Sequence, residues 1–167
     1  MGFTPTDGSD KAARLTELSA AARALVDGET DAVANMANVA AMIWQALPGL
    51  NWAGFYRARD HGQASAHLVL GPFIGKPACI RIPFGQGVCG TAAATGRIQI
   101  VPDVHGFPGH IACDSASRSE LVVPVHRTGK VIAVIDLDSP QLGRFDSVDA
   151  AGIETLAHTI ALAIEER

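Results

Sequence analysis

The sequence has 167 residues, of which 48% are hydrophobic and 18% charged, and its formal net charge is −4. This length predicts a single domain with a core of its own. A mildly acidic chain without a basic stripe is a poor partner for nucleic acid. No apolar run approaches the length of a membrane span, and the N-terminus lacks the basic-then-apolar order of a signal peptide. Three cysteines do not make a disulfide scaffold, so we expect a cytoplasmic protein.

Two helices are predicted in the first fifty residues. After a polar lead-in over residues 1–8, apolar residues recur at helical spacing from Ser9 to Val26, and Gly28 ends the run. A second helix is predicted from Thr30 to Leu47, before a Pro48-Gly49 stop. Its apolar side is expected to carry Val33, Met36, Ala40, Ile43, Trp44 and Leu47.

The next six apolar runs are short and β-branched, and turn residues separate them, which is typical of strands. They are Asn51–Arg57, His67–Leu70, Ala78–Ile82, Ile98–Val101, Leu121–Val125 and Val131–Leu137. A last helix is predicted to begin near Asp146, an N-cap residue followed three positions later by the acidic Asp149. Helices, then strands, then a helix predict an α+β fold. A mostly antiparallel central sheet is flanked by the N- and C-terminal helices over residues 9–167.

The three cysteines lie in different surroundings. Cys113 is in the polar, glycine-flanked stretch Gly109–Ser119, which is typical of a solvated loop. Because cysteine is more often a small buried hydrophobe, this position calls for a chemical explanation. Cys79 lies in a strand-like run and Cys89 in a glycine-lined turn. Each of these two fits an inert buried thiol as well as a reactive one.

Three carboxylates are candidates for one site. Asp136 and Asp138 are two residues apart on a predicted strand, so their side chains point to the same face. Carboxylates at this spacing repel each other, and in a pocket one of them tends to hold a proton at neutral pH. Glu120, at the start of another predicted strand, is the third candidate. The alternative is that the aspartates only end a strand, because the turn residues Ser139-Pro140 follow.

Trp52 and Tyr56 are four residues apart in one predicted strand and therefore share a face. The alternative is that Trp52 belongs to the core, as most tryptophans do. We expect no metal site and no cofactor. The candidate zinc ligands lack the paired Cys-x-x-Cys spacing of structural zinc; they are Cys79, Cys89, His110 and Cys113.

Seven blocks between Asn51 and Phe145 are specific when taken together. They are Asn51-Trp-Ala-Gly-Phe-Tyr56, Leu70-Gly-Pro-Phe73, Gly85-Gln-Gly-Val-Cys-Gly-Thr91, Asp103-Val-His105, Gly109-His-Ile-Ala-Cys-Asp114, Ser119-Glu120 and Asp136-Leu-Asp-Ser139. The Gly-x-Gly of the third block would by itself be a weak phosphate-loop signal. In register, the seven blocks resemble the GAF-domain free methionine-(R)-sulfoxide reductases. The resemblance implies a single GAF domain.

The resemblance also implies an activity, which is the reduction of the R-sulfoxide of free methionine but not of protein-bound methionine. It implies Cys113 as the nucleophile, Cys79 as the favoured resolving thiol and Cys89 as its backup. Thioredoxin is the implied reductant. Because GAF domains often pair through their terminal helices, we expect a homodimer.

The remaining site residues follow from the same resemblance together with the chemistry of a sulfoxide. Trp52 and Tyr56 resemble the aromatic wall against which the S-methyl group packs. Glu120, Asp136 and Asp138 would accept the substrate's ammonium and donate a proton to the sulfoxide oxygen. Which carboxylate does which is left open by the sequence.

Two other functions are alternatives to a reductase. A non-catalytic GAF module that senses a small ligand has no need of three cysteines placed with three acids. A thiol redox sensor or peroxidase needs Cys113 but not the carboxylates Glu120, Asp136 and Asp138 together. Activity on free methionine sulfoxide with a dithiol reductant separates all three functions.

Overall fold

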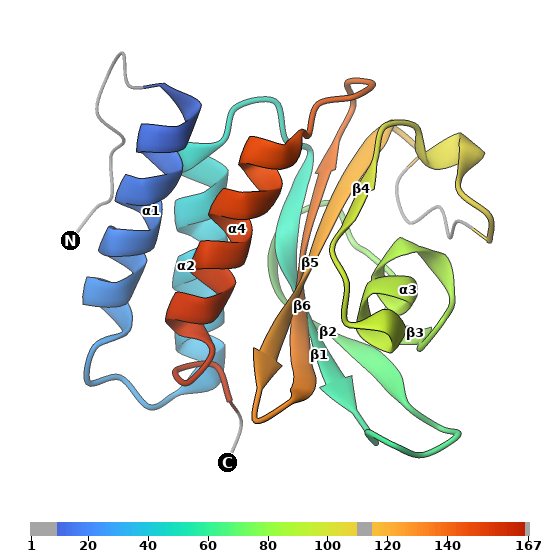
Figure 1. The fold of residues 1–167 in the computed structure, drawn as a ribbon, viewed down its shortest axis with the longest axis horizontal. Helices are drawn as coiled ribbons and strands as arrows, with labels where there is room; N and C mark the ends of the chain where they lie inside the picture. Colours follow the sequence, from blue (N-terminus) through green and yellow to red (C-terminus); the bar gives the residue numbers. More distant parts are fainter. Residues whose placement is uncertain (1–9, 110–114, 166–167) are drawn as a thin grey trace.

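A six-stranded sheet forms the middle of the molecule, with helices on both of its faces (Figure 1). The computed structural model describes residues 10–109 and 115–165, so the predicted lead-in over residues 1–8 lies outside the described residues. The strand order is β3-β2-β1-β6-β5-β4, and every neighbouring pair is antiparallel. The predicted α+β fold is therefore confirmed. Within the described ranges, the structure has no helix with the length and apolarity that a membrane crossing needs.

The elements follow the predicted order closely. The strands are β1 Trp52–Arg59, β2 His67–Gly75, β3 Arg81–Pro83, β4 Gln99–Val101, β5 Ser119–Arg127 and β6 Lys130–Ser139. The helices are α1 Lys11–Val26, α2 Ala32–Ala46, α3 Gly87–Thr95 and α4 Ser147–Ile160, with a short 3-10 turn at Val104–Gly106. Each predicted strand overlaps an observed one, and β2 continues to Gly75, beyond its predicted end at Leu70.

An aspartate is the N-cap residue of each of the three helices on one face of the sheet. Asp10 and Asp31 each accept a hydrogen bond from the backbone N–H three residues later, at 2.7 and 2.8 Å. Asp146 begins α4 in a capping box with Asp149, which confirms the predicted cap. The buried Asp149 carboxylate also pairs with Lys11 at 2.8 Å. This ion pair joins the first helix to the last.

Alternate residues of the sheet contribute to two separate cores, because neighbours along a strand point to opposite faces. One face carries α1, α2 and α4, and its larger core includes the fully buried Leu121 and Ile135. The other face carries α3 (Figure 1), and its smaller core includes Val122 and Val134. Helices α1, α2 and α4 therefore cover the larger core, and α3 covers the smaller one.

Helix α3 stands where the sequence predicts a glycine-lined turn around Cys89, so that prediction is wrong. Glycine is unfavourable in the interior of a helix, and the residues of α3 show no apolar stripe. The sequence pattern therefore does not indicate a helix here. Gly90 is required because a Cβ atom there would collide with the carbonyl of Pro83. Gly96 then ends the helix in the left-handed region with φ of 64°. Cys89 consequently lies in the buried first turn of a helix.

Two further predictions are wrong in detail. The predicted strand Ala78–Ile82 contributes only its end to β3, and Cys79 lies in the loop before that strand. Val33 and Trp44 are 50% and 36% exposed rather than packed inside. At 100° per residue, both lie more than a quarter of a turn around α2 from Val39, which is central to its buried stripe.

Candidate active site

Strand register brings the predicted carboxylates together on the α3 face of the sheet. Glu120 of β5 and Trp52 of β1 both lie directly opposite Asp138 of β6. Residues opposite each other on antiparallel strands point to the same face, with Cβ atoms about 5 Å apart. Asp136 occupies the next position along the same face of β6. Both aspartates therefore lie inside a strand, and not in the turn that follows it.

The rings of Trp52 and Tyr56 form one side of the site. Trp52 stacks on Tyr56 with ring centroids 5.8 Å apart, and on Phe73 of β2 at 5.2 Å. Gly54 leaves room for this arrangement, because a Cβ atom there would collide with Phe73. The indole Nε1 donates a hydrogen bond to the carbonyl oxygen of Lys76 at 3.2 Å, which orients the ring. The predicted shared face of Trp52 and Tyr56 is confirmed.

These side chains line a cavity of about 530 Å³, its mouth included. Its walls come from β1, β3, β5, β6 and α3, and from the loops before β3, α3 and β5. The lining residues are Trp52, Tyr56, Pro77, Ala78, Ile82, Gln86, Gly87, Val88, Cys89, Ser117, Glu120, Asp136 and Asp138. The five residues predicted to contact substrate, together with Cys89, thus share one cavity. The cavity combines an aromatic wall with three carboxylates and a thiol.

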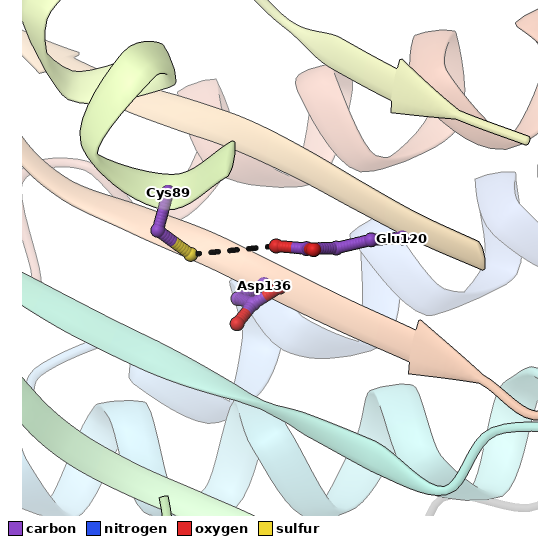
Figure 2. A group of neighbouring side chains, drawn as sticks. All are labelled: Cys89, Glu120 and Asp136. Carbon is purple, nitrogen blue, oxygen red and sulfur yellow. Dashed lines mark hydrogen bonds between the residues drawn. The ribbon is translucent and has the colours of Figure 1, made fainter. Parts of the chain in front are cut away.

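The thiol and two of the carboxylates form a compact buried cluster (Figure 2). Cys89 Sγ donates a hydrogen bond to Glu120 Oε1 over 3.8 Å, and Asp136 lies beside this pair. Burial raises the pKa of Glu120 well above its usual range, and the charges of Asp136 and Asp138 raise it further. Burial also raises the pKa of Asp136 to about 6, although hydrogen bonding to Cys89 and Glu120 limits the rise. The cluster therefore favours a protonated Glu120 at neutral pH.

The same surroundings keep Cys89 and Tyr56 neutral. Burial is the largest cause of the raised pKa of the Cys89 thiol, followed by the charge of Asp136. The same two causes, in the same order, raise the pKa of Tyr56. Because the thiolate is the reactive form of cysteine, a thiol in this position is a weak nucleophile.

The three cysteines predicted to be catalytic differ in what the structure says of them. Cys79 is half-buried in the loop between β2 and β3 and is disulfide-bonded. Cys89 is buried in α3 and carries a free thiol. Cys113 and His110 lie outside the described residues. Ala78, next to Cys79 in the chain, lines the cavity, so the loop that carries the bonded cysteine borders the site.

Sequence reasoning missed several lining residues. Ser117 is 5% exposed, and its Oγ accepts a hydrogen bond from Asn51 Nδ2 at 3.0 Å. Residues 86–88, at the start of α3, also line the cavity. Asn51 and residues 86–88 lie in two of the blocks that carry the family resemblance, and this was a usable signal. Ser117 lies between blocks, in a polar stretch that gives no such signal.

Comparison with known proteins defines the class to which this fold and cavity belong. Residues 10–165 match the GAF domain family, so the chain is a GAF-domain protein. A free methionine-R-sulfoxide reductase of Escherichia coli is 50% identical over 133 residues, which cover 80% of this chain and 78% of that protein. A protein of the same name from Saccharomyces cerevisiae is 46% identical over 151 residues, which cover 87% and 83%.

The solved structures agree with these sequence relationships. The free methionine-R-sulfoxide reductase of Neisseria meningitidis, in complex with its substrate, is 45% identical to this chain with a TM-score of 0.89. The match covers 98% of this chain and 96% of that one. The chain belongs to the family of GAF-domain free methionine-R-sulfoxide reductases, and the resemblance stated from the sequence blocks is confirmed.

Proposed function

We propose that this protein reduces free methionine-(R)-sulfoxide to methionine, with Cys113 as the nucleophile and thioredoxin as the reductant. The observation that carries the proposal is the cavity, where three carboxylates and an aromatic wall face one another. Such a site fits a small amino acid with a cationic ammonium at one end and an apolar methyl group at the other. Membership of the reductase family supports the same substrate.

The three carboxylates divide into an anchor and an acid. Asp138, the least buried of them, is proposed to accept the substrate's ammonium together with Asp136. Glu120, whose pKa burial raises well above its usual range, is proposed to donate its proton to the sulfoxide oxygen. The S-methyl group then packs against Trp52 and Tyr56. Methionine within a peptide has no ammonium for this anchor, which accounts for a preference for the free amino acid.

The proposed chemistry transfers the sulfoxide oxygen to a cysteine. The Cys113 thiolate attacks the sulfur of the protonated sulfoxide and forms a sulfur–sulfur bond. The hydroxyl group then passes from the substrate sulfur to Cys113 as that bond breaks, so methionine leaves and Cys113 becomes a sulfenic acid. The Cys79 thiol then attacks this sulfenic acid, which forms a disulfide and releases water. A dithiol such as that of thioredoxin reduces the disulfide and restores both thiols. The bonded state of Cys79 and the free thiol of Cys89 support Cys79 as the resolving residue, with Cys89 as the backup.

A substrate comparison tests the proposed activity. Both epimers of methionine sulfoxide, free and within a peptide, are offered to the protein while the consumption of reductant is measured. Only the free R epimer should support turnover. Equal turnover of the two epimers, or of the peptide, would contradict the proposal. A non-catalytic ligand-sensing module would bind the sulfoxide without consuming reductant, and a peroxidase would consume it with peroxide alone.

Disulfide mapping tests the role of Cys79. After treatment with the R-sulfoxide in the absence of reductant, mass spectrometry should find a Cys79–Cys113 link. The Cys79→Ser variant should release about one methionine per subunit and then stall with thioredoxin, because one thiol reacts once without a partner. A Cys89–Cys113 link would reassign the resolving residue. The absence of any link to Cys113 would remove this mechanism.

The cytoplasmic location and the homodimer formed through the terminal helices stay predictions. Sedimentation of the purified protein over a range of concentrations tests the second, and a monomer at all of them would contradict it.

A further inference from the structure

Cys89, Glu120 and Asp136 make a set of ligands that suits a metal ion. One ligand atom from each residue lies within 4.8 Å of those of the other two, and all three residues are buried (Figure 2). They come from three different elements, since Cys89 is on α3, Glu120 on β5 and Asp136 on β6. The fold therefore holds the three ligand atoms together without the help of a flexible loop.

The spacing between the sulfur and the Glu120 oxygen is close to that of a tetrahedral zinc site. Zinc binds cysteine sulfur at about 2.3 Å and carboxylate oxygen at about 2.1 Å, so a tetrahedral angle places these two atoms about 3.6 Å apart. Cys89 Sγ and Glu120 Oε1 are 3.8 Å apart. A small adjustment of one side chain would bring both atoms to bonding distance from one ion.

An unpartnered carboxylate oxygen also favours the binding of a cation. Asp136 is 6% exposed, and its Oδ1 atom is buried without a hydrogen-bond partner among the described residues. No lysine, arginine or histidine in the described part of the chain lines the cavity. A buried carboxylate oxygen without a donor is costly, and a bound cation removes that cost.

We propose that the cavity binds one zinc ion, or a similar thiophilic divalent cation, through Cys89 Sγ and the carboxylates of Glu120 and Asp136. The thiolate favours zinc over magnesium and calcium, which prefer oxygen ligands alone. With three protein ligands, the fourth position faces the cavity. This ion is an inhibitor rather than a cofactor, because it occupies the carboxylates that the substrate needs. That last step rests on the proposed function of the cavity.

The site differs from the zinc set that the sequence argues against. Of those four residues only Cys89 takes part, and the two carboxylates replace the others. Spacing along the chain could not reveal this combination, because Cys89, Glu120 and Asp136 meet only through the packing of α3 on the sheet.

The test uses a variant in which Cys89 is the only thiol. Cys79→Ser combined with Cys113→Ser leaves one cysteine of the three in the sequence. Cobalt added to this variant should give the sulfur-to-metal charge-transfer absorption of a thiolate ligand, saturating at one equivalent, and zinc should displace it. Adding Cys89→Ala should abolish the absorption. No absorption in the first variant, or its persistence in the second, would overturn the proposal.

Two substitutions on the same strand separate a ligand from a nearby charge. Asp136→Asn and Asp138→Asn each remove one carboxylate from the same face of β6, but only Asp136 is a proposed ligand. Loss of a ligand should weaken zinc binding at least about tenfold, while loss of a nearby charge should weaken it less than about threefold. Equal losses would mean that the ion is held by the field of the acidic cluster alone and would overturn the assignment of Asp136. Circular dichroism of each variant shows that it is folded.

A competition experiment tests whether the ion binds in the substrate cavity. Free methionine should raise the apparent dissociation constant for zinc in proportion to its concentration. In the wild-type protein, zinc should raise KM for the sulfoxide without changing kcat, and a chelator should reverse this. A phosphine reductant is used because dithiols bind zinc themselves. Zinc binding that methionine does not affect would overturn the inhibition. Because the cobalt signal needs no turnover, an inactive protein would contradict the proposed function and leave the metal site standing.

Discussion

The two faces of one sheet are built in opposite ways. Toward α1, α2 and α4, the side chains of Ile135 and Leu137 are completely buried in the larger hydrophobic core, and such burial stabilises the fold by about 25 cal/mol per Å². On the α3 face, the residues between and after them are Asp136 and Asp138, and Asp136 is nearly as buried. Burying a carboxylate costs free energy unless it is paired. Apolar burial on the face that carries α1, α2 and α4 therefore offsets the free-energy cost of the acidic cavity on the α3 face.

The largest effect is expected where the proposed reacting atom is removed. Cys113→Ser should abolish multiple turnover, because a serine hydroxyl is far too weak a nucleophile for this reaction. Its thermal unfolding should match that of the wild-type protein under reducing conditions. Retained turnover in this variant would end the assignment of Cys113.

A truncation on the face that carries α1, α2 and α4 should lower the stability of the fold. Ile135→Ala removes a completely buried side chain from the larger core and should lower the free energy of unfolding by about 2–5 kcal/mol, measured with urea. The control is Asp136→Asn, one residue along the same strand but on the α3 face, which should not destabilise the protein at pH 8. If both variants lose stability equally, the two faces do not differ as we describe.

Replacement of an acid by its neutral amide on the α3 face should lower activity and raise stability. Glu120→Gln should lower kcat/KM by an amount that corresponds to a loss of about 2–4 kcal/mol in transition-state stabilisation, because the proton donor is lost. The same variant should be more stable than the wild-type protein at pH 8. Wild-type folding must hold a proton on Glu120 at a pH at which the unfolded carboxyl ionises, and glutamine carries no such cost. A loss of less than about threefold in kcat/KM would make Glu120 a structural residue.

The anchor can be separated from the acid by the choice of substrate. Asp138→Asn should lower kcat/KM more for free methionine sulfoxide than for its N-acetylated analogue, because only the former carries the ammonium. The expected loss for the free substrate is about 2–4 kcal/mol. Equal losses for the two substrates would refute the anchoring role of Asp138.

The smallest expected effect is in the pH dependence of stability. The pKa of Asp136 is about 6 in the folded protein against an ordinary value of 3.8, so the folded state binds more protons between these values. Its stabilising contribution is complete below about pH 4 and is lost as the pH rises through about 6. The loss amounts to at most about 3 kcal/mol. Urea unfolding from pH 4 to 8 should show this decline, and Asp136→Asn should reduce it. An unchanged slope in the variant would contradict the raised pKa.

Local patterns were sufficient for most of the fold. The aspartate cap of α4 and the shared face of Trp52 and Tyr56 depend on residues three or four positions apart, and both predictions are confirmed. Helix α3 was missed because its glycines are explained only by contact with another segment, as Gly90 is by the carbonyl of Pro83. The strand predicted over Ala78–Ile82 is mostly wrong because residues 78–80 form a loop, in which Ala78 lines the cavity and Ile80 is exposed; only the last two residues belong to β3.

The sequence by itself determined the α+β class, the period-two alternation that sets Asp136 and Asp138 on one face, and the family of the chain. These depend on neighbouring residues and on blocks that can be compared directly. Only the tertiary structure decided that Glu120 and Trp52 both lie opposite Asp138. Strands β1 and β5 are far apart in the chain, and each pairs with one side of β6. It also decided that Glu120 favours its protonated form. That property arises from burial under α3 and from the charges of two other side chains, which only the packed fold brings together.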